Sequence, residues 1–219
     1  MSPTDNPLEN NEKPRIRGWQ VLVFAALLPA LGLPVLLLFR PASAIATLTA
    51  VFVVMAVAFL AAVLPSGRAV WGLLGIRAAG WRWYVLGTLA VLACSLAATT
   101  LVGAQPQGMR DLGRTLRADG ALLPALLALA LLAPAVEELV FRGLLFGWLE
   151  GRWGGRVALV TSTLVFAAAH LEPMHVAMIL PLGFVLGWMR LRSGSLLPPL
   201  IAHVANNAIA VSALYFGLG

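Results

Sequence analysis

Two adjacent glutamates lie inside an apolar run of the sequence. Glu137 and Glu138 fall within residues 120–148, and Arg142 follows four residues after Glu138. An ionisable side chain inside a membrane segment costs about 2.5–3.5 kcal/mol on insertion scales, so it is a candidate for function. Glu138 and Arg142 share one helix face and can form an ion pair. Glu137 points about 100° away around the helix, which leaves it to face a cavity as a general acid or base.

Histidine and asparagine recur at helical spacing on the following apolar runs. Phe166 and His170 lie four residues apart, and His203 and Asn207 repeat this spacing near the C-terminus. Residues four apart share a helix face. An imidazole can transfer a proton, and an amide can donate a hydrogen bond to a developing oxyanion. The alternative interpretation is that these polar groups only tie helices together.

The hydrophobicity of the chain predicts that membrane helices position these residues. Of 219 residues, 60% are hydrophobic and 11% are charged, whereas soluble domains have about 25% charged residues. A membrane-spanning helix needs about 20 apolar residues. Apolar runs lie at 21–39, 42–64, 83–104, 120–148, 156–171, 174–190 and 195–217. The predicted fold is all-α, a polytopic membrane helix bundle of about seven transmembrane helices, within a range of about six to eight.

The chain divides into three predicted parts. Residues 1–17 are polar and are expected to form a disordered cytoplasmic tail, and residues 18–119 to form N-terminal transmembrane scaffold helices. Residues 120–217 form the transmembrane region that carries all the polar motifs. Within it, Pro134 is expected to kink the helix one turn before Glu138, because proline has no amide hydrogen to donate.

Basic residues predict the orientation of the bundle. With the N-terminus in the cytoplasm, most of the 15 lysines and arginines fall on the cytoplasmic side, as the positive-inside rule requires. Arg142 belongs to a helix end, and the four exceptions on the outer side are Arg40, Arg110, Arg114 and Arg117. The net charge of +6 is therefore a feature of membrane topology, and no nucleic-acid partner is expected.

The three motifs resemble those of the CPBP family of intramembrane proteases. They are Glu-Glu-x-x-x-Arg at 137–142, Phe-x-x-x-His at 166–170 and His-x-x-x-Asn at 203–207, in this order on successive helices. The family groups CAAX prenyl proteases with bacterial Abi proteins linked to bacteriocin processing and self-immunity. The resemblance implies an endopeptidase of the bacterial plasma membrane. Its partners would be the lipid bilayer and a peptide or protein substrate, lipidated in CAAX-type processing.

The resemblance also implies catalytic roles for four residues. Glu137 and His170 would activate a water for attack on a peptide carbonyl, while His203 and Asn207 would stabilise the oxyanion. Three further residues, Glu138, Arg142 and Phe166, would support them. Arg142 would hold Glu138, and Phe166 would shape the pocket. No cofactor is needed for this mechanism.

Three alternatives remain open at the level of sequence. In a metalloprotease version, Glu137, His170 and His203 would bind zinc, with water in the fourth position. The sequence lacks a His-Glu-x-x-His helix, which favours the version without metal. A proton-coupled carrier would use the same residues as a proton relay, and a non-catalytic membrane protein would keep them as a structural core.

Overall fold

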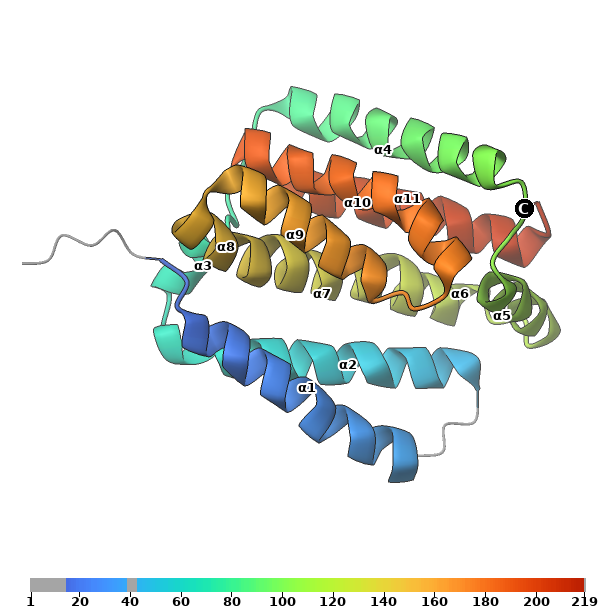
Figure 1. Ribbon diagram of the computed structural model, residues 1–219. Helices are drawn as coiled ribbons and strands as arrows, with labels where there is room; N and C mark the ends of the chain where they lie inside the picture. The colour runs from blue at the N-terminus through green and yellow to red at the C-terminus, as the bar shows by residue number, and fades with distance from the viewer. Residues whose placement is uncertain (1–14, 39–42, 219) are drawn as a thin grey trace, which may run out of the picture.

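The computed structural model describes residues 15–38 and 43–218 of the chain (Figure 1). These residues form helices and no strand. The long helices are α1 (Gly18–Leu38), α2 (Ala44–Val63), α4 (Trp81–Val102), α9 (Gly155–Ala168), α10 (Pro173–Ser193) and α11 (Leu197–Phe216). Between them lie η1 (Leu64–Ser66), α3 (Ala69–Leu73) and α5 (Gln107–Ala118).

A further long rod, residues 122–153, is built from five consecutive helical segments. Its segments are α6 (Leu122–Ala125), η2 (Leu126–Leu132), α7 (Ala133–Glu137), η3 (Glu138–Leu145) and α8 (Phe146–Trp153). The segments η2 and η3 are π-helices, in which each amide bonds to the carbonyl five residues earlier. The two wider turns flank the segment that contains Pro134 and Glu137.

The seven predicted apolar runs correspond to six long helical elements and α9. Within the described part of the chain, six helices are long and apolar enough to cross a membrane, including the rod over Leu122–Trp153. The exception, α9, has 14 residues, about 21 Å of helix, which is shorter than a hydrocarbon core of about 30 Å. The predicted class, a polytopic helix bundle, is confirmed.

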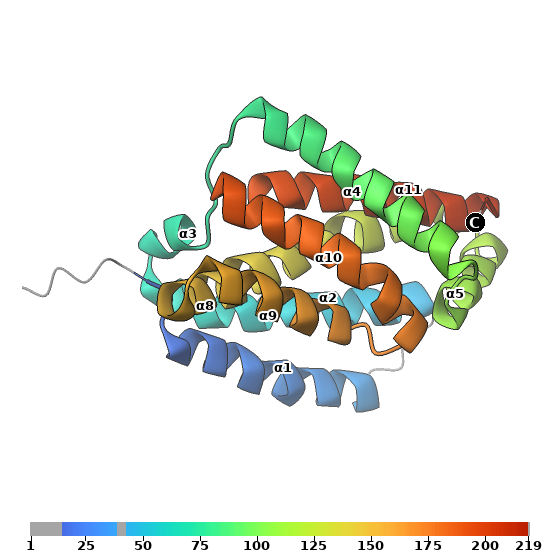
Figure 2. The same cartoon turned by 45° about the horizontal axis from the view of Figure 1, so that its top comes forward.

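The rod lies in the middle of the bundle. Helices α1 and α2 pair with each other on one side of it, while α4 covers α10 and α11 on the other side (Figures 1 and 2). In the most apolar 18-residue stretch of the rod, 50% of the residues are buried, whereas 0% are buried in the corresponding stretch of α1. The rod is therefore the helix that packs against both sides, and α1 is the outermost.

Two parts of the chain differ from a simple series of spans. The predicted tail falls largely on residues 1–14, which lie outside the described residues, but Ile16 is buried against the bundle. The connection after α4 contains α5, an amphipathic helix that the apolar pattern did not predict. Its buried residues, Gly113 and Leu116, face the bundle, and its arginines are exposed.

Candidate active site

A fully buried ion pair lies at the centre of the rod. Arg142 Nη1 donates to Glu138 Oε1 at 3.1 Å, as the four-residue spacing predicted, and neither side chain is exposed. Arg142 Nη2 also donates to the carbonyl of Gly183 at 3.0 Å, and its guanidinium lies 4.0 Å from the centre of the Phe166 ring. Arg142 thus joins the rod to both α9 and α10.

The close approach at this point depends on a glycine. A Cβ atom placed on Gly183 would lie 2.9 Å from the Phe166 ring and 3.4 Å from Arg142 Nη2. Real Cβ contacts are rarely so short, so only glycine lets the backbone of α10 reach the guanidinium. Phe166 itself is buried beneath Arg142, which makes it a support for the charged cluster rather than part of the cavity wall.

His203 contacts both glutamates. Its Nδ1 lies 2.9 Å from Glu138 Oε1, and its Nε2 lies 3.6 Å from Glu137 Oε2. The His203 side chain is 3% exposed, and Glu137 is 13% exposed. The sequence prediction had paired Glu137 with His170, but the imidazole in direct reach of Glu137 is that of His203.

A cavity of about 980 Å³ opens beside these groups. Glu137, His203 and His170 reach it from one side, and apolar side chains of α1 and α2 form much of the opposite wall. Glu137 is therefore the carboxylate that faces a cavity, as its position on the helix predicted. Glu138 stays behind it, because its Oε1 is shared by Arg142 and His203.

Asn207 takes the place of a backbone donor that Pro134 lacks. The amide of Ala133 donates to the carbonyl of Ala128, five residues earlier. In the same register the next donor would be Pro134, which has no amide hydrogen, and its acceptor would be the carbonyl of Leu129. Asn207 Nδ2 donates to that carbonyl at 3.0 Å. One hydrogen of the Asn207 amide group therefore remains for another acceptor.

Asn206 belongs to the same polar group as Asn207. Its Nδ2 lies 3.3 Å from Asn207 Oδ1, and both asparagines line the cavity. This contact fixes the Asn207 amide, because an oxygen that accepts from Asn206 leaves the nitrogen to face Leu129. Asn206 and Asn207 are consecutive, and both reach the cavity because α11 runs along the edge of the cavity.

The tautomer of His170 follows from its backbone contact. His170 Nδ1 lies 3.0 Å from the carbonyl oxygen of Phe166. A carbonyl only accepts hydrogen bonds, so Nδ1 carries the hydrogen and neutral His170 presents an unprotonated Nε2. That is the form required of a general base.

His175 is a further histidine that lines the cavity. It lies in the first turn of α10, with its ring centre 4.8 Å from that of His170. Phe166 packs on the other side of His170, with ring centres 5.1 Å apart. His175 therefore packs against the His170 ring, and the only signal for this contact in the sequence is the short separation of the two histidines along the chain.

The turn that carries His170 is tied to α5. Glu172 accepts hydrogen bonds from the backbone amides of Gln107 at 2.7 Å and Gly108 at 3.4 Å. These amides open α5 and have no acceptor within that helix. A negative charge at this end also stabilises the helix dipole. Leu171, between His170 and Glu172, has φ 61°, a left-handed conformation that is costly for leucine.

Replacing Glu172 with alanine is expected to loosen the start of α5. Loss of a capping carboxylate costs about 0.5–2 kcal/mol of local stability, which corresponds to about two- to thirtyfold faster hydrogen exchange in the first turn. Hydrogen–deuterium exchange measured by mass spectrometry checks this. Glu150→Ala, far from α5, serves as the control, and unchanged exchange at 107–110 in the Glu172 variant would contradict the capping role.

The zinc alternative does not have a preformed ligand set. Among the described residues, no three histidine, cysteine, aspartate or glutamate side chains are close enough together to hold a metal ion. Zinc bound by Glu137, His170 and His203 stays a hypothesis that requires these side chains to move toward one another.

The fold and the site together define a polytopic membrane protein with a buried glutamate, histidine and arginine cluster beside an internal cavity. Residues 119–209 match the family model described as type II CAAX prenyl endopeptidase Rce1-like. The predicted resemblance to CAAX proteases is thereby confirmed for this segment, which is less than half of the chain. It contains every residue of the predicted site.

Two curated relatives match parts of the chain. One, of Bacillus subtilis (strain 168), is named "Putative membrane peptidase YdiL" and is 26% identical over 82 residues, 37% of this chain and 34% of the relative. The other, "Uncharacterized 24.3 kDa protein" of Escherichia coli, is 37% identical over 94 residues, 39% of this chain and 42% of the relative. The matches thus span less than half the length of either relative. No solved structure matches the chain.

Proposed function

We propose that this chain is an intramembrane endopeptidase that hydrolyses a peptide bond with a water activated by Glu137. The observation that carries the proposal is that Glu137, His203 and His170 reach one cavity, within the segment that matches a peptidase family. The activity follows from this geometry together with the family likeness.

In the proposed reaction, Glu137 accepts a proton from a water held in the cavity. The water oxygen bonds to the carbonyl carbon of the substrate, and the carbonyl electron pair moves to its oxygen. His170 Nε2 is the second acceptor available to position the water. When the tetrahedral intermediate collapses, the C–N bond breaks and Glu137 returns the proton to the leaving amine.

Hydrogen-bond donors for the oxyanion are available on α11. The second hydrogen of Asn207 Nδ2 is not used by Leu129, and the amide is held in place by Asn206. His203 Nε2 lies 3.6 Å from Glu137 Oε2, and it can donate a hydrogen bond to the oxyanion when it carries a hydrogen. A single donor of this kind contributes about 10²–10³-fold in rate in a well-studied protease.

The walls of the cavity favour a substrate with an apolar group next to the cleavage site. The side that faces Glu137 is formed by apolar residues of α1 and α2, among them Phe24, Leu28 and Phe52. An isoprenoid chain or an apolar peptide segment would bury its surface there. We propose CAAX-type processing of a lipidated C-terminus, with processing of an unmodified bacteriocin-type peptide as the alternative substrate.

Peptide cleavage by detergent-purified protein tests the proposal. The panel contains prenylated CAAX peptides, the same peptides without the lipid, and unmodified apolar peptides, each assayed with and without a chelator. We expect the prenylated peptides to be cleaved with a kcat/KM at least about tenfold higher than their unmodified forms, because each buried CH₂ contributes about 0.8 kcal/mol.

The outcomes of this panel separate the alternatives. Cleavage that survives the chelator supports the glutamate mechanism without metal, whereas cleavage lost with chelator and restored by zinc supports the zinc mechanism. Equal rates with and without the lipid would reject prenyl recognition. If the wild-type protein cleaves none of the peptides, the proposed activity is contradicted for all three substrate classes.

A further inference from the structure

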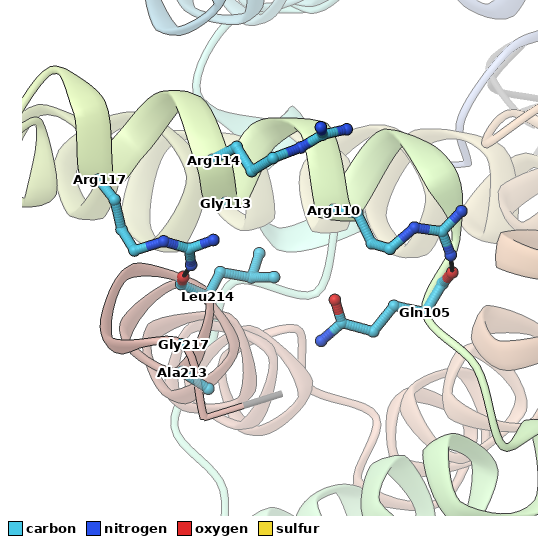
Figure 3. Close-up of a pocket in the computed structure, with 8 residues that line it drawn as sticks. All are labelled: Gln105, Arg110, Gly113, Arg114, Arg117, Ala213, Leu214 and Gly217. Atoms are coloured by element: carbon cyan, nitrogen blue, oxygen red, sulfur yellow. Dashed lines mark hydrogen bonds between the residues drawn. The ribbon is translucent and has the colours of Figure 1, made fainter.

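A second cavity lies at the end of the bundle where α5 meets the end of α11. It has a volume of about 480 Å³ and is lined by three arginines of α5, Arg110, Arg114 and Arg117. Figure 3 shows Arg117 reaching from α5 to the Leu214 carbonyl at the end of α11, while Arg110 turns toward the Gln105 carbonyl. We call this cavity the arginine pocket.

The arginines recur at helical spacing and keep unused donors. Intervals of four and three residues place Arg110, Arg114 and Arg117 along one side of α5. Arg110 donates to the Gln105 carbonyl and Arg117 to the Leu214 carbonyl, while Arg114 pairs with Asp111. Each guanidinium carries five N–H donors, so each has several left.

The charge of the arginine pocket is positive. No acidic residue is among the described residues that line it. Three carboxylates lie on or beside α5: Asp111, which pairs with Arg114, Glu172, which caps the start of α5, and Asp119, which ends the helix. The last carbonyls of α11 carry partial negative charge, and Arg117 is bonded to one of them, that of Leu214. Arg110 is left without a carboxylate partner among these groups.

Two glycines keep the floor of the pocket open. A Cβ on Gly113 would lie 3.3 Å from the Leu214 carbonyl oxygen and 3.4 Å from Arg117 Nη1. Gly217 ends α11 with φ +68°, in the left-handed region that favours glycine. Because neither residue has a side chain, the space between the arginines and α11 stays free.

The position of α5 places the pocket at the membrane surface. This helix joins the end of one candidate span, α4, to the start of another, the rod over Leu122–Trp153. Such a connection lies at the level of the lipid headgroups. Three of the four basic residues that the charge distribution places on the outer side are in this pocket, so the positive-inside rule does not account for them.

We propose that the arginine pocket binds the phosphate of an anionic phospholipid headgroup. Guanidinium groups bind phosphate oxygens through paired, charge-assisted hydrogen bonds. Free inorganic phosphate offers the same chemistry, but the pocket lies where headgroups are concentrated. None of its arginines lines the cavity that contains Glu137, although Leu214 borders both cavities.

Thermal unfolding in detergent with added lipid tests the proposal. Short-chain phosphatidylglycerol, phosphatidylcholine with the same acyl chains, and inorganic phosphate are titrated separately. We expect phosphatidylglycerol to raise Tm in a saturable way, more than either of the others. In the Arg110→Gln/Arg114→Gln variant the apparent affinity for phosphatidylglycerol should fall by about 25-fold, from about fivefold for each arginine near an anionic lipid.

Two further variants make the result specific. Arg68→Gln/Arg82→Gln removes two exposed arginines at the opposite end of the bundle and should retain the wild-type affinity, and Arg110→Lys/Arg114→Lys should lose only part of it. The proposal is overturned if the glutamine variant of the pocket keeps the lipid effect, if both glutamine variants lose it equally, or if wild-type Tm does not respond. An equal response to inorganic phosphate would overturn the lipid as ligand.

Discussion

Replacing Glu137 with glutamine is expected to lower kcat for peptide cleavage by about 10²–10⁴-fold, the usual contribution of a general base. Glutamine keeps the size of the side chain but cannot accept the proton of the attacking water. The nearest partner of Glu137, His203 Nε2, lies 3.6 Å away, and glutamine keeps an oxygen at this position, so Tm should change little. The measurement is single-turnover cleavage of the best substrate by the folded variant.

Glu150→Gln is the matched control for this experiment. Glu150 lies in α8 of the same rod, outside the residues that line the cavity, and its substitution should leave cleavage at the wild-type rate. Equal cleavage by the wild-type protein and the Glu137 variant would remove Glu137 from the mechanism. Loss of cleavage with a large fall in Tm would mean that the glutamate is structural.

Removing the charge of Arg142 is expected to have the largest effect on stability. Glu138 is fully buried, and both its partners, Arg142 and His203, bind the same oxygen, Oε1. Its other oxygen, Oε2, has no hydrogen-bond partner among the described residues. Without Arg142 the carboxylate would depend on His203 alone, and leaving one member of a buried pair unpaired costs about 3–5 kcal/mol. Arg142→Met should therefore lower Tm strongly.

Two comparisons separate this effect from a general loss of charge. Arg68→Met removes an exposed arginine and should leave Tm close to the wild-type value. In Arg142→Met/Glu138→Leu, the second substitution removes the unpaired charge and should restore part of the stability. A Tm for Arg142→Met equal to that of Arg68→Met would show that the buried pair does not stabilise the fold.

Much of the fold could be predicted because lipid imposes a simple rule on the sequence. Apolar runs of about 20 residues become helices that satisfy most of their own backbone in the membrane, and each of the seven runs contains a helix. The helix α5 in the connection at 104–120 was not predicted, because it is amphipathic and contains no long apolar run. It is stabilised by packing on α11 and by Glu172. Those contacts come from distant parts of the chain.

The candidate site was predictable where it depends on spacing within one helix. The pairing of Glu138 with Arg142 follows from four residues of helix. The contacts of His203 with Glu137 and Glu138 depend on how α11 crosses the rod, and helix spacing holds no information about that crossing. His175 was missed for the same reason, since its contact with His170 is made across the turn between α9 and α10.

The bond between Asn207 and the carbonyl of Leu129 makes positions 134 and 207 interdependent. With any residue other than proline at 134, the backbone could supply its own donor to that carbonyl, and the Asn207 amide would be released to turn elsewhere. With an apolar residue at 207, the Leu129 carbonyl would lose the donor that replaces the missing amide hydrogen of Pro134. Each of the two residues therefore depends on the presence of the other. Substitutions at positions 134 and 207 are expected to be epistatic, and the two positions are expected to change together.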